Sequence, residues 1–211
     1  MSRPRTPRAD AVRNRTKILA AAREQITVHG PDTGMDRIAA AAGVAVGTLY
    51  RHFPTKTDLV AAVVIEYVTQ VADDAEATRA RVESGASALD ELAGFLARVV
   101  ELTATDQAAK VAAGTLGADT AAGVEEQRAG TAMAALIRAG QADGDIHPDV
   151  TVSDIYLLFS TAPTDRPKSA RARWLALVLP GLTTHAPPPA RPEFCPSIYP
   201  TDCGPNHGGR A

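Results

Sequence analysis

The chain has 211 residues, 45% of them hydrophobic and 22% charged, and a net charge of −2, a balance that excludes wholesale disorder. Its two cysteines, Cys195 and Cys203, both lie close to the C-terminus, which excludes a disulfide scaffold and a four-cysteine zinc module. Because no apolar run approaches the ~20 residues of a membrane span and the N-terminus lacks the apolar stretch of a signal peptide, we expect a cytoplasmic protein with no membrane partner.

Alanine supplies 41 of the residues. Because alanine is the best helix former and a poor strand former, an all-α fold is predicted. A first helix should run from about Thr6-Pro7 to His29, where Gly30-Pro31 ends it, since glycine accepts a left-handed conformation and proline cannot continue a helix. The apolar residues of this helix recur at helical spacing and are Ile18, Leu19, Ala22 and Ile26.

Two short helices are predicted next. Thr33 and Asp36 have the spacing of a capping box at the start of the first one, and Gly43 should end it. The second covers about Val46 to His52 and is broken by Pro54, which cannot donate the next helical hydrogen bond. The residues expected to be buried on these two helices are Met35, Ile38, Ala39, Ala42, Leu49 and Phe53.

A longer helix is predicted after a second capping box at Thr55 and Asp58, and its two neighbouring apolar stripes indicate burial on more than one side. Beyond it, helices are expected at about residues 86–104, 107–117, 121–141, 151–161 and 168–180. From Ala186 onward the chain is rich in proline and glycine, so it cannot bury enough apolar surface to fold, and a disordered tail is predicted.

Charge is distributed unevenly along the chain. Residues 1–60 hold 10 Lys and Arg against 5 Asp and Glu, whereas the rest of the chain is net acidic. A basic N-terminal segment on an acidic body indicates a polyanionic partner for that segment. The alternative is a solvated tail followed by an ordinary charged helix face.

Residues 33–53 have the pattern of a helix, a tight turn and a second helix. Ala39 and Gly43 are small where two helices would cross closely, and Val44 and Leu49 are apolar where the second would pack on the first. This is the layout of a helix-turn-helix, which places its second helix in the major groove of DNA. The solvent side of that helix would carry Val46, Gly47, Thr48, Tyr50, Arg51 and His52.

Several of these side chains suit contacts with DNA. Thr48 and Tyr50 can donate hydroxyl hydrogens to phosphates, and the fork of Arg51 can read the edge of a guanine. Lys56 lies in the first turn of the next helix, whose amide groups also favour a phosphate. Plainer alternatives stay open: Tyr50 as a packed aromatic, His52 as an ordinary surface histidine, and Arg51 as a phosphate contact.

The stretch from Thr16 to Tyr67 resembles the DNA-binding domain of the Tet repressor (TetR) family of bacterial transcriptional regulators. The resemblance lies in ILAAAREQITVHG and MDRIAAAAGVAVGTLYRHFPTKTDL, and its most specific part is GTLYRHFPTK. It implies a homodimeric repressor that binds double-stranded operator DNA and, in its C-terminal domain, a small-molecule effector. The positions that the resemblance places on DNA are Thr33, Arg37, Val46, Thr48, Tyr50, Arg51, His52 and Lys56. Ala45 stands where the family often has serine, so the second helix should lack a side-chain cap.

On this interpretation the chain divides into a basic disordered arm (1–9), a helix-turn-helix domain (10–56), an effector-binding and dimerisation domain (57–185) and a tail (186–211). Dimerisation is expected through the last two helices, which would form a four-helix bundle with those of a partner. The residues expected there are Ile155, Leu158, Phe159, Trp174, Leu175, Val178 and Leu179. The sequence does not identify the effector-binding residues.

Two other functions are compatible with the sequence. One is a small helical enzyme or carrier with an incidental basic N-terminus, and the other is a DNA-binding activator that needs no ligand. Because the chain has no P-loop, dinucleotide fingerprint or hydrolase motif, we expect neither catalysis nor a cofactor. His147 lies near three aspartates, but without a second cluster of ligands it predicts no metal site.

Overall fold

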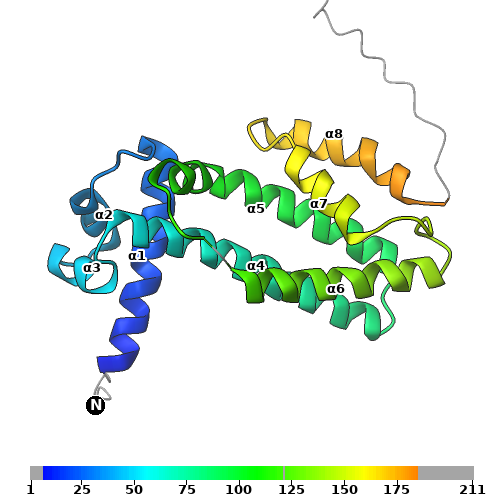
Figure 1. Ribbon diagram of the computed structural model, residues 1–211, viewed down its shortest axis with the longest axis horizontal. Coiled ribbons are helices and arrows are strands. Elements are labelled where there is room, and N and C mark those ends of the chain that lie inside the picture. The colour runs from blue at the N-terminus through cyan, green and yellow to red at the C-terminus, as the bar shows by residue number, and fades with distance from the viewer. Residues whose placement is uncertain (1–6, 121, 185–211) are drawn as a thin grey trace, which may run out of the picture.

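The computed structural model describes residues 7–120 and 122–184, which form eight α-helices and one short 3-10 helix (Figure 1). The predicted all-α fold is confirmed. The predicted tail and residues 1–6 of the predicted arm lie outside the described residues, whereas residues 7–9 already belong to the first helix. Within the described residues, no helix combines the length and the apolar character needed to cross a membrane.

The first three helices form one end of the molecule, drawn in blue to cyan in Figure 1: α1 (Pro7–His29), α2 (Met35–Ala42) and α3 (Val46–His52). The limits expected for these helices are confirmed. Leu49 of α3 and Ile38 of α2 are both fully buried, in an apolar cluster that also contains the middle of α1. This burial fixes which side of α3 is left facing outward.

The bend between α2 and α3 is made at Gly43, which is left-handed with a φ of 64°. The Gly43 N–H donates to the Ala40 carbonyl and the Val44 N–H donates to the Ala39 carbonyl, both at 3.1 Å. This Schellman pattern satisfies carbonyls that the end of α2 would otherwise leave open. Glycine suits the position because a residue with a Cβ rarely adopts this conformation.

The capping box predicted at Thr33 and Asp36 does not form. The residue that precedes α2 is Gly34, which makes no side-chain cap. The Thr33 hydroxyl donates instead to the carbonyls of Gly30 at 3.0 Å and Gln25 at 3.1 Å. Thr33 therefore closes the turn after α1, and its side chain is buried there.

The second predicted capping box, at Thr55 and Asp58, is confirmed at the start of α4 (Lys56–Glu83). The Asp58 N–H donates to Thr55 Oγ1 at 3.1 Å, and the Thr55 N–H donates to Asp58 Oδ2 at 3.0 Å. The first turns of α4 pack into the N-terminal cluster through Leu59, Val60 and Val63. The domain boundary expected after residue 56 thus falls in the first turn of a helix that continues into the rest of the molecule (Figure 1).

The next helix, α5, runs without a break over Ala88–Leu116, so the prediction of two helices, at 86–104 and 107–117, is wrong. The polar residues between them are accommodated inside the helix. Thr105 donates its hydroxyl to the Glu101 carbonyl at 3.1 Å, and Asp106 turns inward to meet Arg23 of α1. Because neither glycine nor proline occurs there, nothing in the backbone ends the helix.

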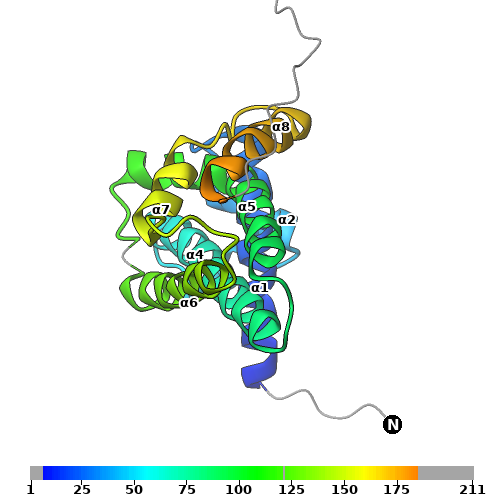
Figure 2. The same ribbon diagram turned by 90° about the vertical axis from the view of Figure 1, so that its right-hand side faces the viewer.

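Three further α-helices and the 3-10 helix complete the fold: α6 (Gly123–Ala142), α7 (Val152–Thr161), α8 (Lys168–Val178) and η1 (Leu179–Leu182). Helix α4 packs against both α5 and α6, while α7 lies against α6 and α8 against α5 (Figure 2). Their shared core is a second apolar cluster, distinct from the N-terminal one, whose largest buried side chains include Leu92, Phe95, Leu96, Leu136, Ile146 and Ile155.

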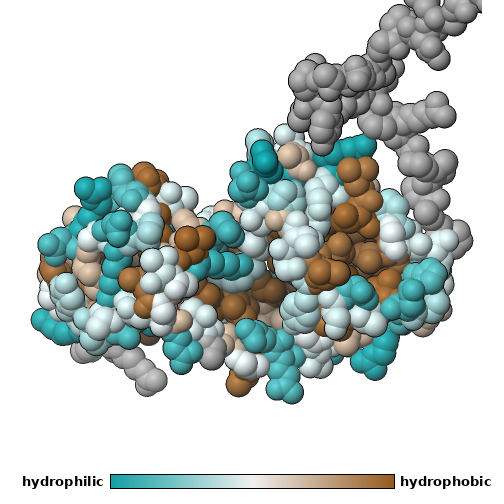
Figure 3. Space-filling model, turned by 45° about the horizontal axis from the view of Figure 1, so that its top comes forward, coloured by the Kyte–Doolittle hydropathy of each residue, from teal (hydrophilic) through white to brown (hydrophobic). Residues whose placement is uncertain are grey.

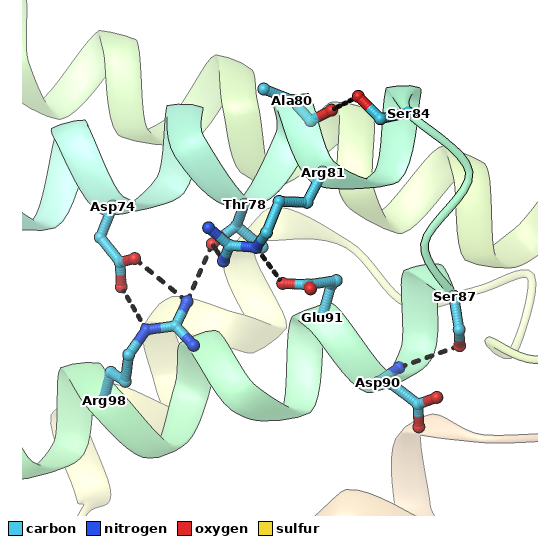
Figure 4. Close-up of polar contacts among 9 residues, drawn as sticks. All are labelled: Asp74, Thr78, Ala80, Arg81, Ser84, Ser87, Asp90, Glu91 and Arg98. Carbon is cyan, nitrogen blue, oxygen red and sulfur yellow. Dashed lines mark hydrogen bonds and ion pairs between the residues drawn. The ribbon is translucent and has the colours of Figure 1, made fainter.

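Polar contacts hold α4 and α5 together where the second half of α4 meets the first half of α5 (Figure 4). Arg98 of α5 donates to both carboxylate oxygens of Asp74, at 2.9 and 3.1 Å, and to the Thr78 hydroxyl at 2.9 Å. Arg81 of α4 donates in the other direction, to Glu91 of α5, at 2.8 Å. The two helices are therefore fixed relative to each other at the end remote from α3.

Candidate DNA-binding surface and ligand cavity

Helix α3 has one buried and one outward side, because residues one turn apart share a face. Leu49 is fully buried and Phe53, directly after the helix, is nearly so. The outward edge that the sequence predicted is in place. Its exposed members are Val46, Gly47, Tyr50 and Arg51, and its half-buried members are Thr48 and His52.

Three basic side chains at this end of the molecule, on α2, α3 and the start of α4, are not neutralised within the described part of the chain. Among the described residues, no carboxylate lies within ion-pair distance of Arg37, Arg51 or Lys56. By contrast, Arg98 and Arg128, in the remaining helices, are both ion-paired. Unpaired guanidinium and ammonium groups remain available to bind phosphate.

Helix α1 adds a basic residue that the sequence identified only as part of a basic run. The Arg15 guanidinium lies 5.2 Å from the centre of the Phe53 ring, within the range of a cation–π contact. Because Phe53 follows α3 directly, this contact places Arg15 beside the end of α3. The pairing could not be found from sequence spacing, since α2 lies between the two residues in the chain.

The remaining predicted DNA positions differ in how they are presented. Arg37 is exposed on α2, and Lys56 is half-buried at the start of α4. The structure does not bring the Thr33 side chain to the surface, because its hydroxyl is committed to the two carbonyls described above. Ala45 precedes α3 with an extended backbone and no side-chain cap, as its sequence position predicts.

A cavity of about 410 Å³ lies between α4, α5, α6 and α7, within the size range of small-molecule sites. Its walls are mainly apolar, and only one lining residue carries a charge. The spacing of apolar residues is the same for a packed core as for a cavity wall, so the sequence pattern does not distinguish the two. The lining residues are Tyr67, Val68, Val71, Phe95, Val99, Glu126, Ala129, Met133, Val152, Ile155, Tyr156 and Phe159.

Tyr67 connects this cavity to α5. Its hydroxyl lies 2.8 Å from the Thr103 hydroxyl, and Lys110 Nζ lies 3.7 Å from the centre of its ring. The neighbouring residue on α4, Glu66, accepts a hydrogen bond from Arg23 of α1 at 3.3 Å. Tyr67, which lines the cavity, is therefore the sequence neighbour of a residue that contacts α1.

The residues predicted for dimerisation mainly face the chain's own core. Ile155 and Leu175 are buried in the second cluster, while Leu158, Phe159, Trp174, Val178 and Leu179 are half-buried against it. The outward apolar side chains of α7 and α8 include Leu157 and Leu177, which are 62% and 60% exposed. Figure 3 shows hydrophobic side chains gathered on the side of the molecule where α7 and α8 lie.

His147 is the histidine that the sequence places near three aspartates. The His147 ring contacts Asp149. Over the ranges that the structure covers, no group of three or more metal-ligating side chains occurs. Cys195 and Cys203 lie outside the described residues.

Two family models match the chain. Residues 18–63 match bacterial regulatory proteins of the tetR family, and residues 87–184 match the C-terminal domain of SbtR-like transcriptional regulators. Together the matches cover both the helices around α3 and most of those around the cavity. No curated protein matches the chain.

Solved structures of regulators share the fold. A TetR transcription regulatory protein from Mycobacterium vanbaalenii is 32% identical over 84% of this chain and 99% of its own, with a TM-score of 0.68. A TetR transcriptional regulator from Streptomyces coelicolor is 30% identical over 80% of this chain and 98% of its own, with a TM-score of 0.65. A gamma-butyrolactone receptor, 24% identical over 83% of this chain and 90% of its own, has the same fold with a TM-score of 0.57.

Proposed function

Because the chain belongs to the TetR family of DNA-binding transcriptional regulators, we propose that it acts in the cytoplasm as a homodimeric repressor, released from a palindromic operator by a small-molecule effector. The outward edge of α3 carries the proposal. Tyr50 and Arg51 are exposed there, and Arg51 has no carboxylate partner among the described residues. Arg51 would read a guanine edge in the major groove, while Tyr50 and Lys56 would bind phosphates and set the register.

A dimer follows from how such helices bind DNA. Two recognition helices must enter successive major grooves, about 34–36 Å apart, and the described part of one chain has a single helix with this outward edge. The exposed Leu157 and Leu177 support pairing through α7 and α8, which would form a four-helix bundle with a second copy. Arg171 holds α8 on α5 through two hydrogen bonds to Glu101, of 3.0 and 2.6 Å, so the proposed interface is rigidly attached to the rest of the chain.

The cavity is the proposed effector site. An effector can release the operator only if it binds the DNA-free arrangement more tightly than the DNA-bound one, and couplings of this kind are usually ~1–3 kcal/mol. Tyr67 lines the cavity and contacts α5, and its neighbour Glu66 contacts α1. A ligand that displaces Tyr67 would therefore act on α5 and on α1, which belongs to the DNA-binding end.

Selection of bound duplexes from a random DNA pool by the full-length protein tests the proposal. We expect a near-palindrome whose half-sites are centred about one helical turn apart. With Arg51→Ala the same selection should lose its preference at one position in each half-site, whereas Arg138→Ala, a matched change on α6, should leave the motif unchanged. A pool without any enriched motif, or a single asymmetric site, would contradict the dimeric repressor.

A further inference from the structure

We infer that the cavity between α4, α5, α6 and α7 binds a mainly apolar molecule that carries one cationic group of the substituted-ammonium class. This inference rests on the proposed function, because it concerns the effector of the same site. It follows from three features of the cavity wall: the absence of any basic side chain, one free carboxylate at its edge, and a concentration of aromatic rings.

The wall offers no positive charge to an anionic ligand. None of the twelve lining residues is lysine, arginine or histidine. Two cations on helices that form the cavity already have partners, since Arg128 donates to Glu76 at 3.0 Å and to Asp73 at 2.8 Å, and Lys110 lies over the Tyr67 ring. An anion buried here would lose its hydration without gaining a counter-charge, which is costly. Carboxylates and phosphates are therefore disfavoured.

The one charged residue of the wall is Glu126 of α6. Its side chain is exposed, so it lies at the edge of the cavity. Its neighbour Glu125 contacts Arg128, whereas the side-chain carboxylate of Glu126 has no hydrogen-bond or ion-pair partner in the part of the chain that the structure describes. A free carboxylate at the opening of an apolar cavity complements a cation whose apolar body enters first.

Aromatic side chains of the cavity wall are the third feature that favours an organic cation. Only 4% of the chain is Phe, Trp or Tyr, yet Tyr67, Phe95, Tyr156 and Phe159 all line this cavity. The rings of Phe95 and Phe159 meet edge to face with their centres 6.4 Å apart, so ring faces are presented in more than one direction. Such faces attract organic cations and pack well against their apolar parts.

The test uses three probes with one skeleton and different charge: phenylbutyl trimethylammonium, phenylbutanol and phenylbutyrate. Binding to the full-length protein is measured by titration calorimetry. We expect the cation to bind about tenfold more tightly than the alcohol and the carboxylate to bind more weakly than either. Equal affinity for the cation and the alcohol, or preference for the carboxylate, would overturn the inference.

Variants locate the effect at one carboxylate. Glu126→Gln should weaken cation binding about three- to fivefold, because the pair is partly solvated, and should leave alcohol binding unchanged. Glu24→Gln, which removes an exposed glutamate on α1 that does not line the cavity, should change neither. Ala129→Leu should weaken all three probes by filling the cavity. If the cation binds this last variant normally, or Glu126→Gln has no effect, the inference is wrong.

The same probes separate this inference from the proposed function. Operator binding is measured with and without saturating cation. If the cation binds in a Glu126-dependent way but leaves operator affinity unchanged, the inferred ligand class is supported. The proposal that the cavity is the effector site is then wrong. If the alcohol and the cation release the operator equally at equal saturation, the proposal that the cavity is the effector site is supported. The inference that the effector must be a cation is then wrong.

Discussion

Arg23 of α1 donates from Nε to Oδ1 of Asp106 of α5 across 2.5 Å. The Asp106 side chain is only 1% exposed, and its other oxygen has no hydrogen-bond partner among the described residues. The same guanidinium reaches Glu66 of α4 at 3.3 Å. One arginine thus ties the DNA-binding end of the chain to both helices that lead to the cavity.

The burial of Asp106 should make stability depend on pH in an unusual direction for an aspartate. Burial raises the pKa of Asp106 above its ordinary value of 3.8, despite the opposing effect of Arg23. The folded state therefore holds the proton more tightly than the unfolded state, and the free energy of unfolding falls as pH rises from about 3.8 to the raised pKa. Urea unfolding at a series of pH values should show Asp106→Asn gaining stability relative to wild type across this interval. Asp32→Asn, an exposed control, should not, and an unchanged difference for Asp106→Asn would contradict the raised pKa.

Removing the arginine should cost more than removing the aspartate. Arg23→Ala leaves a buried carboxylate without its main partner, a change that typically costs about 3–5 kcal/mol. Adding Asp106→Asn to that variant removes the unpaired charge, so the double variant should be more stable than Arg23→Ala alone. Urea unfolding of the four proteins at neutral pH completes the cycle. Additive effects would show that the two side chains do not interact.

The uncapped start of α3 offers a stabilising substitution. Ala45 has φ −65° and ψ 142°, the extended conformation of a capping residue, without a side-chain hydrogen bond. Ala45→Ser should raise the free energy of unfolding by about 0.5–1 kcal/mol. Ala41→Ser, on the exposed side of α2, should instead lower it slightly, because serine is a weaker helix former than alanine. Denaturant unfolding distinguishes the two, and equal effects would argue against a cap at residue 45.

The proposed dimer depends on the outward side of α8. Leu177→Glu should convert the protein to a monomer in sedimentation at micromolar concentration, because two carboxylates would then meet in an apolar interface. Val124→Glu makes the same change at a residue of α6 that is 72% exposed, and should leave the dimer intact. A Leu177→Glu protein that still sediments as the wild type does would place the interface elsewhere.

The sequence predicted the DNA-binding end well because its limits are marked locally. Gly30, Gly43 and Pro54 end the three helices where the backbone requires it, and Leu49 lies one helical turn from Phe53. The local sequence pattern gave a wrong prediction around Asp106, where it indicated a break between two helices that are one helix in the structure. Its partner is Arg23, 83 residues away, and no pattern within α5 reveals that contact.

The C-terminal helices show a second limit of sequence patterns. An apolar stripe on α7 or α8 predicts burial, but it does not say whether the chain's own core or another chain covers it. Ile155 and Leu175 are covered by the chain itself, whereas Leu157 and Leu177 are not. The cavity was missed for a related reason, since Tyr67 and Glu126 come from separate helices and only the folded chain brings them to one wall.

Binding of the selected operator duplex by Gly47→Glu, followed by fluorescence anisotropy, is the most direct test of the role of α3. Nothing lies within 4 Å of a Cβ built at Gly47, and a glutamate in the first turn of a helix favours its formation, so the fold should persist in thermal unfolding. The carboxylate would nevertheless face the phosphates, and we predict a loss of operator affinity of at least about 100-fold. Gly123→Glu, with the same open surroundings in the first turn of α6, should bind as the wild type does. A folded, dimeric Gly47→Glu protein with wild-type affinity would contradict the placement of α3 on DNA.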